Sequence, residues 1–213
     1  MTSTPPAARI RMNTEQLQKA AWILKRGGLV VYPTESSYAL GASALDESAI
    51  QKVYDAKGRG FRKPIPVIVA DLHMWSKYAH LGREAKLLIS AFMPGPLTVV
   101  LKKRKRIPDI LTPTSLAARI PGHPVARKLV KDVGFPITST SANLSGQPPA
   151  FSVQHLKEPL RSSVDLLLDV GRLPRGRPST IVDLTNPIEP QIVREGPISK
   201  SQVFAVLNAG RRA

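Results

Sequence analysis

Short apolar runs of strand type alternate with helical patterns along this chain, and this alternation constrains the fold most. The apolar runs are residues 29–32, 65–70, 97–101, 116–120 and 136–141, and the helical patterns include 46–57, 83–92 and 124–133. A helix near 152–158 follows, and further strands are predicted near 164–169, 180–184 and 191–194. Strands joined by helices predict an α/β domain, and the late cluster of strands predicts that its sheet is mixed.

Local signals place the ends of several helices. Asn13, with Gln16 three residues later, has the pattern of a capping box, and Gly27-Gly28 ends that first helix. Asp46 and Asp71 are N-cap residues for two further helices. Pro124 suits the first turn of a fourth helix, and Ser199 can cap a last helix through Asn208.

The length of 213 residues suits one sizeable domain, which we place at residues 12–210, after a disordered N-terminal lead at 1–11. The chain has no cysteine, so it has neither disulfides nor thiolate metal sites. The absence of disulfides fits a cytoplasmic protein. No apolar run approaches the roughly 18 residues of a membrane span, so we expect no membrane partner.

The charge is strongly basic, with 31 Lys and Arg against 15 Asp and Glu, for a net charge of +16. Anionic partners are therefore expected, such as nucleotides or RNA. The run Lys102–Arg106 is the densest in charge, and it is interpreted first as a solvated hairpin tip and second as an RNA-facing patch.

A basic, glycine-containing loop, Lys57-Gly58-Arg59-Gly60-Phe61-Arg62-Lys63-Pro64, lies between a predicted helix and a predicted strand. Its cations suit a triphosphate or a nucleic-acid backbone, since guanidinium and ammonium groups both bind phosphate oxygens. A solvated basic loop is the alternative interpretation.

Small polar side chains follow two of the predicted strands. Thr34 and Ser36 come directly after strand 29–32, where open α/β sheets bind ligands. Segment 138–146 has six hydroxyl or amide side chains among nine residues, which suits phosphate or amino-acid recognition. A capped turn and a hydroxyl-rich turn are the respective alternatives.

Four arginines lie in or beside predicted strands. Arg119 interrupts an apolar strand, and an unpaired buried guanidinium costs several kcal/mol, so its partner is either a ligand or an internal carboxylate. Arg175-Gly176-Arg177 and Arg194 are weaker candidates. The common nucleotide-binding and hydrolase motifs are absent, so a nucleotide site here would be built from cations at several strand ends.

Seven motifs occur in an order that resembles the YrdC-like threonylcarbamoyl-AMP synthase family. They are Tyr-Pro-Thr-Glu, Lys-Gly-Arg, Pro-Gly-Pro-Leu-Thr, Ala-Arg-Ile-Pro-Gly-His-Pro, Ser-Ala-Asn-x-Ser-Gly, Pro-Ser-Thr-Ile-Val-Asp and Arg-Glu-Gly. They extend over residues 27–198. The resemblance implies a single YrdC-like domain: a twisted mixed sheet flanked by helices, with a basic concave cavity.

The resemblance also implies a reaction in which L-threonine, bicarbonate and ATP, carried with Mg²⁺, give threonylcarbamoyl-adenylate and pyrophosphate. The adenylate would serve t6A modification at position 37 of tRNA through a separate tRNA threonylcarbamoyltransferase complex. By the same resemblance, the residues on the threonine side would be Thr34, Arg119, Ser139 and Ser179. Those on the ATP side would be Lys57, Arg59, Lys63, Ser141, Asn143 and Arg194.

This chain departs from the family pattern in two ways. It reads Pro66-Val67-Ile68 where many relatives have a histidine, and it ends without the extra C-terminal domain and linker of the longer members. We therefore expect the short, single-domain form. Two alternatives stay open: a YciO-like paralogue that does not make the adenylate, and a tRNA-binding or double-stranded-RNA-binding module without catalysis. The motifs Lys57-Gly58-Arg59 and Ser141-Ala142-Asn143 favour the synthase over the paralogue.

Overall fold

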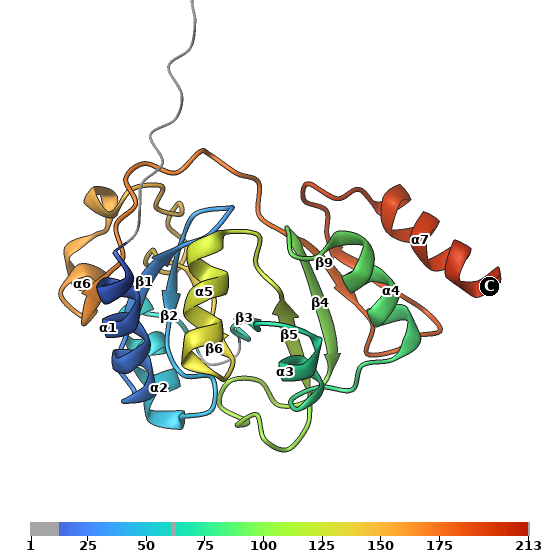
Figure 1. The fold of residues 1–213 in the computed structure, drawn as a ribbon, viewed down its shortest axis with the longest axis horizontal. Helices are drawn as coiled ribbons and strands as arrows, with labels where there is room; N and C mark the ends of the chain where they lie inside the picture. Colours follow the sequence, from blue (N-terminus) through green and yellow to red (C-terminus); the bar gives the residue numbers. More distant parts are fainter. Residues whose placement is uncertain (1–12, 61–62, 213) are drawn as a thin grey trace, which may run out of the picture.

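The computed structural model describes residues 13–60 and 63–212, with side chains as far as 210. The predicted lead at 1–11 and Arg62 of the basic loop lie outside the described residues. The described part is a mixed α/β fold, as predicted, in which helices flank the strands (Figure 1). No helix in this part is long and apolar enough to cross a membrane.

The first four elements are α1 (Thr14–Lys25), β1 (Val30–Pro33), β2 (Tyr38–Gly41) and α2 (Glu47–Lys57). The side chain of Asn13 caps α1 by accepting a hydrogen bond from the Glu15 N–H, and Asp46 caps α2 in the same way. Gly58 ends α2 in the left-handed conformation, with φ of 55°, which glycine adopts without steric cost. Strand β2 was not predicted, because four small and apolar residues after a polar turn carry no clear alternation.

The middle of the chain contains α3 (Leu72–Ser76), α4 (Arg83–Phe92), β4 (Leu97–Lys102), β5 (Ser115–Arg119) and α5 (Pro124–Val133). All five match predicted segments to within two residues or begin at the predicted cap. The run that follows β4 lies at the end of the β4–β5 hairpin, as interpreted, and there the Lys103 ammonium pairs with Asp109.

The prediction of one sheet was wrong, because the strands form two mixed sheets. The smaller has the order β7-β2-β1-β8 and the larger β10-β9-β4-β5-β3-β6. The remaining strands are β3 (Val67–Ile68), β6 (Ile137–Thr138), β7 (Thr140–Ser141), β8 (Leu166–Leu167), β9 (Thr180–Asp183) and β10 (Gln191–Arg194).

The two sheets meet where the predicted strand 136–141 divides at Ser139. Before this residue β6 pairs with β3 of the larger sheet, and after it β7 pairs with β2 of the smaller sheet. The Ser139 N–H donates to the carbonyl of Pro66, while the Thr138 N–H donates to that of Ala42. One apolar run therefore belongs to two sheets, which the local pattern could not reveal.

Three further predictions were too long. The run 65–70 is buried through Val69, but only Val67–Ile68 pair as a strand. The helix near 152–158 is a 3-10 turn (Val153–His155) followed by α6 (Glu158–Arg161), and the strand near 164–169 is only β8. Ser199 precedes the last helix, α7 (Lys200–Arg212), which extends four residues beyond the predicted end.

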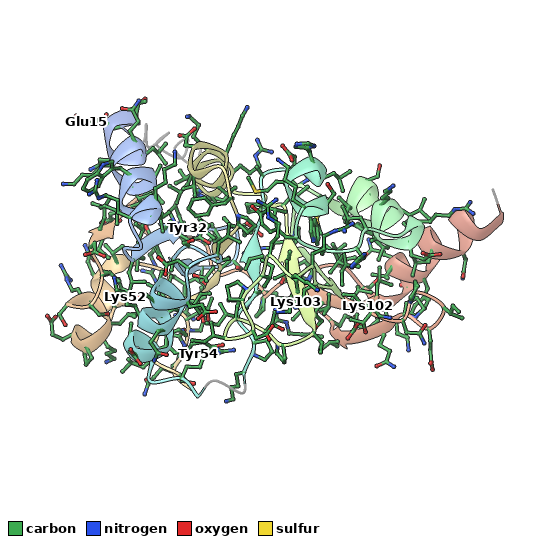
Figure 2. All side chains as sticks on the ribbon, turned by 90° about the horizontal axis from the view of Figure 1, so that it is seen from below. Glu15, Tyr32, Lys52, Tyr54, Lys102 and Lys103 are labelled. Carbon is green, nitrogen blue, oxygen red and sulfur yellow. The ribbon has the colours of Figure 1, made fainter. Side chains whose placement is uncertain are left out.

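One apolar core extends under both sheets, and its largest fully buried side chains include Trp75, Tyr32 and Tyr54. Figure 2 shows Tyr32 surrounded by other side chains beneath α1. After β8 the chain crosses from the smaller sheet to β9 of the larger one, the orange segment at the top of Figure 1. This connection, residues 168–179, is called the strap below.

Candidate active site

A cavity of about 420 Å³ lies between the two sheets. Eight of the ten predicted site residues line it, namely Thr34, Arg59, Arg119, Ser139, Ser141, Asn143, Ser179 and Arg194, whereas Lys57 and Lys63 do not. Gly176 and Pro178 of the strap form part of its wall. Tertiary folding thus brings residues from six separate motifs to one place.

Arg119, at the end of β5, has its side chain buried except for 9% of its surface. Its Nη1 lies 3.1 Å from Oε1 of Glu35, so the partner left open by the sequence includes an internal carboxylate. That Oε1 accepts no aligned hydrogen bond, and none from the Arg119 guanidinium is found within the described residues. Most of the guanidinium donors therefore remain available on a group that lines the cavity.

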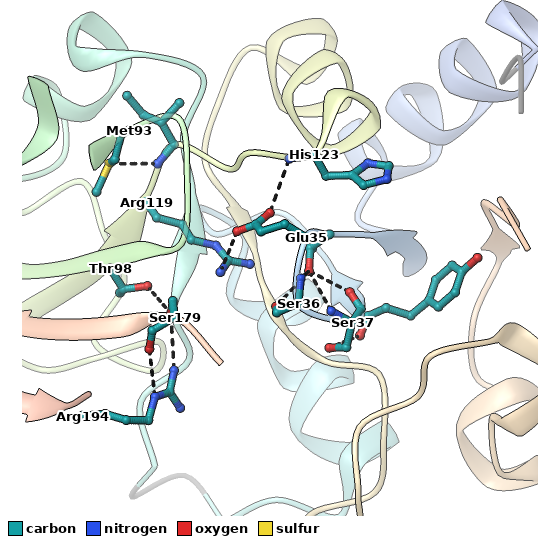
Figure 3. A network of polar contacts seen from close by, with 12 residues as sticks. Glu35, Ser36, Ser37, Met93, Thr98, Arg119, His123, Ser179 and Arg194 are labelled. Carbon is teal, nitrogen blue, oxygen red and sulfur yellow. Dashed lines mark hydrogen bonds and ion pairs between the residues drawn. The ribbon is translucent and has the colours of Figure 1, made fainter. Parts of the chain in front are cut away.

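Thr98, Ser179 and Arg194 form a second polar network in the same wall (Figure 3). The hydroxyls of Thr98 and Ser179 are 2.9 Å apart, and Arg194 donates from Nε to the Ser179 carbonyl at 3.0 Å. Burial lowers the pKa of Arg194, and the nearby charge of Arg119 lowers it further. Arg194, predicted on the ATP side, thus lies beside two residues predicted on the threonine side.

The Ser139 hydroxyl adds an unsatisfied polar group at the junction of the two sheets. It lies beside the Tyr32 phenol but makes no hydrogen bond of acceptable geometry, although its Oγ is buried. A buried polar atom without a partner costs about 1–3 kcal/mol. Because Ser139 lines the cavity, a ligand would supply the missing partner.

Thr34 organises the β1–β2 turn. Its hydroxyl donates to the Ser37 carbonyl at 2.7 Å and accepts from the N–H groups of Ser36 and Ser37, both at 3.3 Å. Its hydrogen-bonding capacity is therefore already used, which is the capped-turn alternative from the sequence. The same turn presents the neighbouring Ser36 to the cavity.

Lys57 is only 2% exposed and lies beneath the loop that follows β7. Its ammonium donates to the carbonyls of Ser141 and Asn143, the latter at 2.7 Å, and to Asn143 Oδ1 at 3.3 Å. Burial, assisted by the charge of Arg59, lowers the pKa of Lys57 to about 8. All three ammonium protons are engaged, so Lys57 supports the Ser141–Asn143 loop from behind.

Arg59 reaches the cavity, and Lys63 does not. The Arg59 guanidinium donates to the backbone carbonyls of Lys63 and Pro64, at 3.2 and 3.0 Å, and thereby folds the basic loop onto itself. The Lys63 side chain is exposed and lies outside the cavity lining. Its assignment as a phosphate contact stays a prediction.

The described residues include no group of three or more His, Cys, Asp or Glu side chains that could hold a metal ion.

The family model for Sua5, YciO and YrdC, described as "Telomere recombination", matches residues 22–196. The chain belongs to this family. A putative threonylcarbamoyl-AMP synthase of Methanocaldococcus jannaschii is 37% identical over 81% of this chain and 84% of its own length. The threonylcarbamoyl-AMP synthase of Bacillus subtilis is 36% identical, over 92% of this chain but only 57% of its own length.

Solved structures of the family agree with the fold. Sua5 of Pyrococcus abyssi, complexed with L-threonine, is 35% identical with a TM-score of 0.87, over 92% of this chain and 58% of that one. YciO of Escherichia coli is 31% identical with a TM-score of 0.79, over 90% and 94%. This Sua5/YciO/YrdC family member thus spans less than two thirds of the B. subtilis and P. abyssi proteins.

The sequence did not single out Glu35 or Thr98 as site residues, although both lie within motifs that carried the resemblance. Glu35 pairs with Arg119, and Thr98 pairs with Ser179 (Figure 3). The carboxylate in a polar turn and the threonine in an apolar strand were the available signals. Neither could indicate its partner, which lies more than 80 residues away.

Proposed function

We propose that this chain is a threonylcarbamoyl-AMP synthase, which converts L-threonine, bicarbonate and ATP to threonylcarbamoyl-adenylate and pyrophosphate. The observation that carries the proposal is the cavity itself. It combines a nearly buried guanidinium with available donors, an unsatisfied serine hydroxyl and a hydroxyl-amide loop beside Arg59. The family membership and the names of the relatives support the same reaction.

The Arg119 guanidinium would bind the threonine carboxylate, for which its planar fork of donors is suited. Ser139 and Ser179 would contact the rest of the amino acid. Arg59, Ser141 and Asn143 would hold the phosphates, with Lys57 supporting their loop. Mg²⁺ would enter with ATP, since magnesium at nucleotide sites commonly takes phosphate oxygens as ligands.

The proposed chemistry has two steps. The threonine amine, after losing a proton, forms a carbamate with carbon dioxide from bicarbonate, which releases water. A carbamate oxygen then attacks the α-phosphorus while the bond to the β-phosphate breaks. Arg194, beside Ser179 and near Arg119, suits the point where the two substrates meet, and cations there would stabilise the charge of the departing pyrophosphate.

The decisive experiment measures threonine-dependent pyrophosphate with ATP, Mg²⁺, bicarbonate and labelled threonine. We expect pyrophosphate and labelled adenylate from the wild type and almost none from Arg59→Ala. Folded wild-type protein that releases no pyrophosphate would contradict the proposal and favour the YciO-like alternative. We name this alternative because the structure resembles E. coli YciO over 94% of that protein's length.

The product would supply tRNA modification in the cytoplasm through a separate threonylcarbamoyltransferase complex.

Direct binding of tRNA or double-stranded RNA is a second proposal, favoured by the net charge and by a more open hollow of about 840 Å³ lined by Lys102–Lys105. Titration of tRNA at several salt concentrations tests it, because phosphate contacts make affinity fall steeply with salt. Affinity that does not change with salt would contradict it.

A further inference from the structure

Glu35 has no role in the proposed reaction so far, yet within the described part of the chain it is the only carboxylate paired with the guanidinium on which threonine recognition depends. Of the ion pairs found among the described residues, one involves the cavity, and it joins Glu35 to Arg119. The Glu35 side chain is 20% exposed and is not part of the cavity lining, although Thr34 and Ser36 on either side of it are.

Main-chain groups border Glu35. The backbone N–H of His123 donates to its Oε2 at 3.4 Å, at the start of α5, where the helix dipole favours a negative charge. A Cβ on Gly122 would lie 3.8 Å from the carboxyl carbon, and a Cβ on Gly176 of the strap would lie 2.7 Å from the Glu35 main-chain carbonyl oxygen. The His123 N–H and the helix dipole thus favour the carboxylate in the position where it meets Arg119.

The contact orients the guanidinium without saturating it. The ion pair uses Nη1, and the Oε1 it meets accepts no aligned hydrogen bond. A bidentate carboxylate would occupy one whole edge of the guanidinium, whereas here the Nη2 and Nε donors both have no partner among the described residues. A second acidic group can therefore bind the same arginine.

We propose that Glu35 is a positioning residue for threonine recognition: it fixes the direction in which Arg119 presents its remaining donors to the substrate carboxylate. This inference rests on the proposed function. It differs from a competitive role, in which Glu35 would occupy Arg119 and have to leave before threonine could bind. The two roles predict opposite changes in threonine affinity when the charge is removed.

The test compares Glu35→Gln, Glu35→Asp and the control Glu189→Gln, which makes the same chemical change on an exposed loop. KM for threonine and for ATP are measured from pyrophosphate release, together with Tm. With Glu35→Gln we expect KM for threonine to rise by about tenfold or more, as for a misplaced binding group, with KM for ATP within about twofold of wild type. Glu35→Asp keeps the charge but withdraws it by one methylene, so it should raise KM for threonine as well. Glu35→Asp also provides the test if the Glu35→Gln variant does not fold.

An unchanged or lowered KM for threonine in the folded variants would overturn the inference, and a lowered value would indicate competition. Equal increases in both KM values would also overturn it, because they would indicate a general loss of structure. If the wild type itself releases no threonine-dependent pyrophosphate, the proposed function has failed instead. The wild-type measurement thus separates the two failures.

Discussion

At the scale of single residues, the buried cations affect both the stability of the fold and the binding of ligands. Lys57 illustrates the balance, since its ammonium satisfies three acceptors of the Ser141–Asn143 loop while its burial disfavours the charge. Removing it would leave the Asn143 carbonyl without a donor, because within the described residues only the Ser141 carbonyl also accepts a backbone bond, from the Asn143 N–H. It would also remove the cost of a buried charge. These two effects on the free energy of unfolding oppose each other. For a phosphate site, in contrast, the lost hydrogen bonds to the loop and the lost positive charge both weaken binding.

We therefore expect Lys57→Met to raise KM for ATP by about ten- to a hundredfold, because the loop loses its support. The free energy of unfolding should change by no more than about 2 kcal/mol. Pyrophosphate assays and urea unfolding measure the two quantities. Lys86→Met, an exposed position on α4 outside the cavity lining, is the matched control. A normal KM for ATP in Lys57→Met would show that the loop holds its shape without the ammonium.

The lowered pKa of Lys57 predicts opposite pH trends for stability and for ATP binding. Below pH 8 the lysine is charged in both the folded and the unfolded chain. Between pH 8 and the ordinary lysine pKa of 10.5 only the unfolded chain keeps this proton, so the contribution of Lys57 to the unfolding free energy rises with pH. The ATP site loses a positive charge over the same interval, so KM for ATP should rise.

Comparison of wild type with Lys57→Met across pH 7–10 isolates this residue, because every other titrating group is shared. The difference in unfolding free energy and the difference in KM should both depend on pH above about 8. Parallel pH profiles for the two proteins would contradict the lowered pKa of Lys57.

At the scale of elements, the strap decides the shape of the cavity wall. Gly176 lies so close to the β1–β2 turn that a Cβ there would meet the Glu35 carbonyl at 2.7 Å and the Ser36 Cα at 3.1 Å. Both are main-chain atoms, which cannot rotate aside. Only glycine allows this approach of two backbones.

Gly176→Ala should therefore push the strap away from the turn. We expect KM for threonine to rise and the free energy of unfolding to fall by about 1–3 kcal/mol, the usual cost of overpacking. Gly82→Ala, at the start of α4, is the control, because its Cβ would meet only the end of the Glu84 side chain at 3.6 Å. Equal effects of the two substitutions would show that the close approach does not matter.

At the scale of the whole molecule, the cavity is lined by both sheets. Its lining takes Thr34 and Ser141 from the side of the smaller sheet, and Arg119 and Ser179 from that of the larger. A ligand that contacts both groups would tie the sheets together. Binding to the folded state alone stabilises it by mass action.

ATP with Mg²⁺, or threonine, at about 100 times its Kd should therefore add roughly 2.7 kcal/mol to the unfolding free energy when it is the one ligand added. For a chain of this size each kcal/mol corresponds to about 2–4 °C in Tm. Thermal unfolding with and without ligands measures the shift. The shift should shrink in Arg119→Ala when threonine is the added ligand, and an unchanged shift there would contradict the role of Arg119.

The elements of this fold were largely predictable from the sequence. Helical spacing and capping residues located α1, α2, α4 and α5, because such signals act within one or two turns of the chain. The short strands were harder, since two-residue strands such as β3, β6 and β8 are defined by their partners and not by their own pattern.

The site was predictable as a set of motifs but not as an arrangement. The sequence by itself determined the α/β class, the positions of α1, α2, α4 and α5 and the basic and hydroxyl-rich segments, because these depend on side-chain type and local spacing. Only the tertiary structure decided that the strands make two sheets divided at Ser139. It also decided that Arg119 forms an ion pair with Glu35 and that Lys57 supports a loop instead of lining the cavity. The physical reason is distance along the chain: these contacts join residues 69 or more positions apart, and no local pattern encodes which distant group will fill a given hydrogen bond or charge.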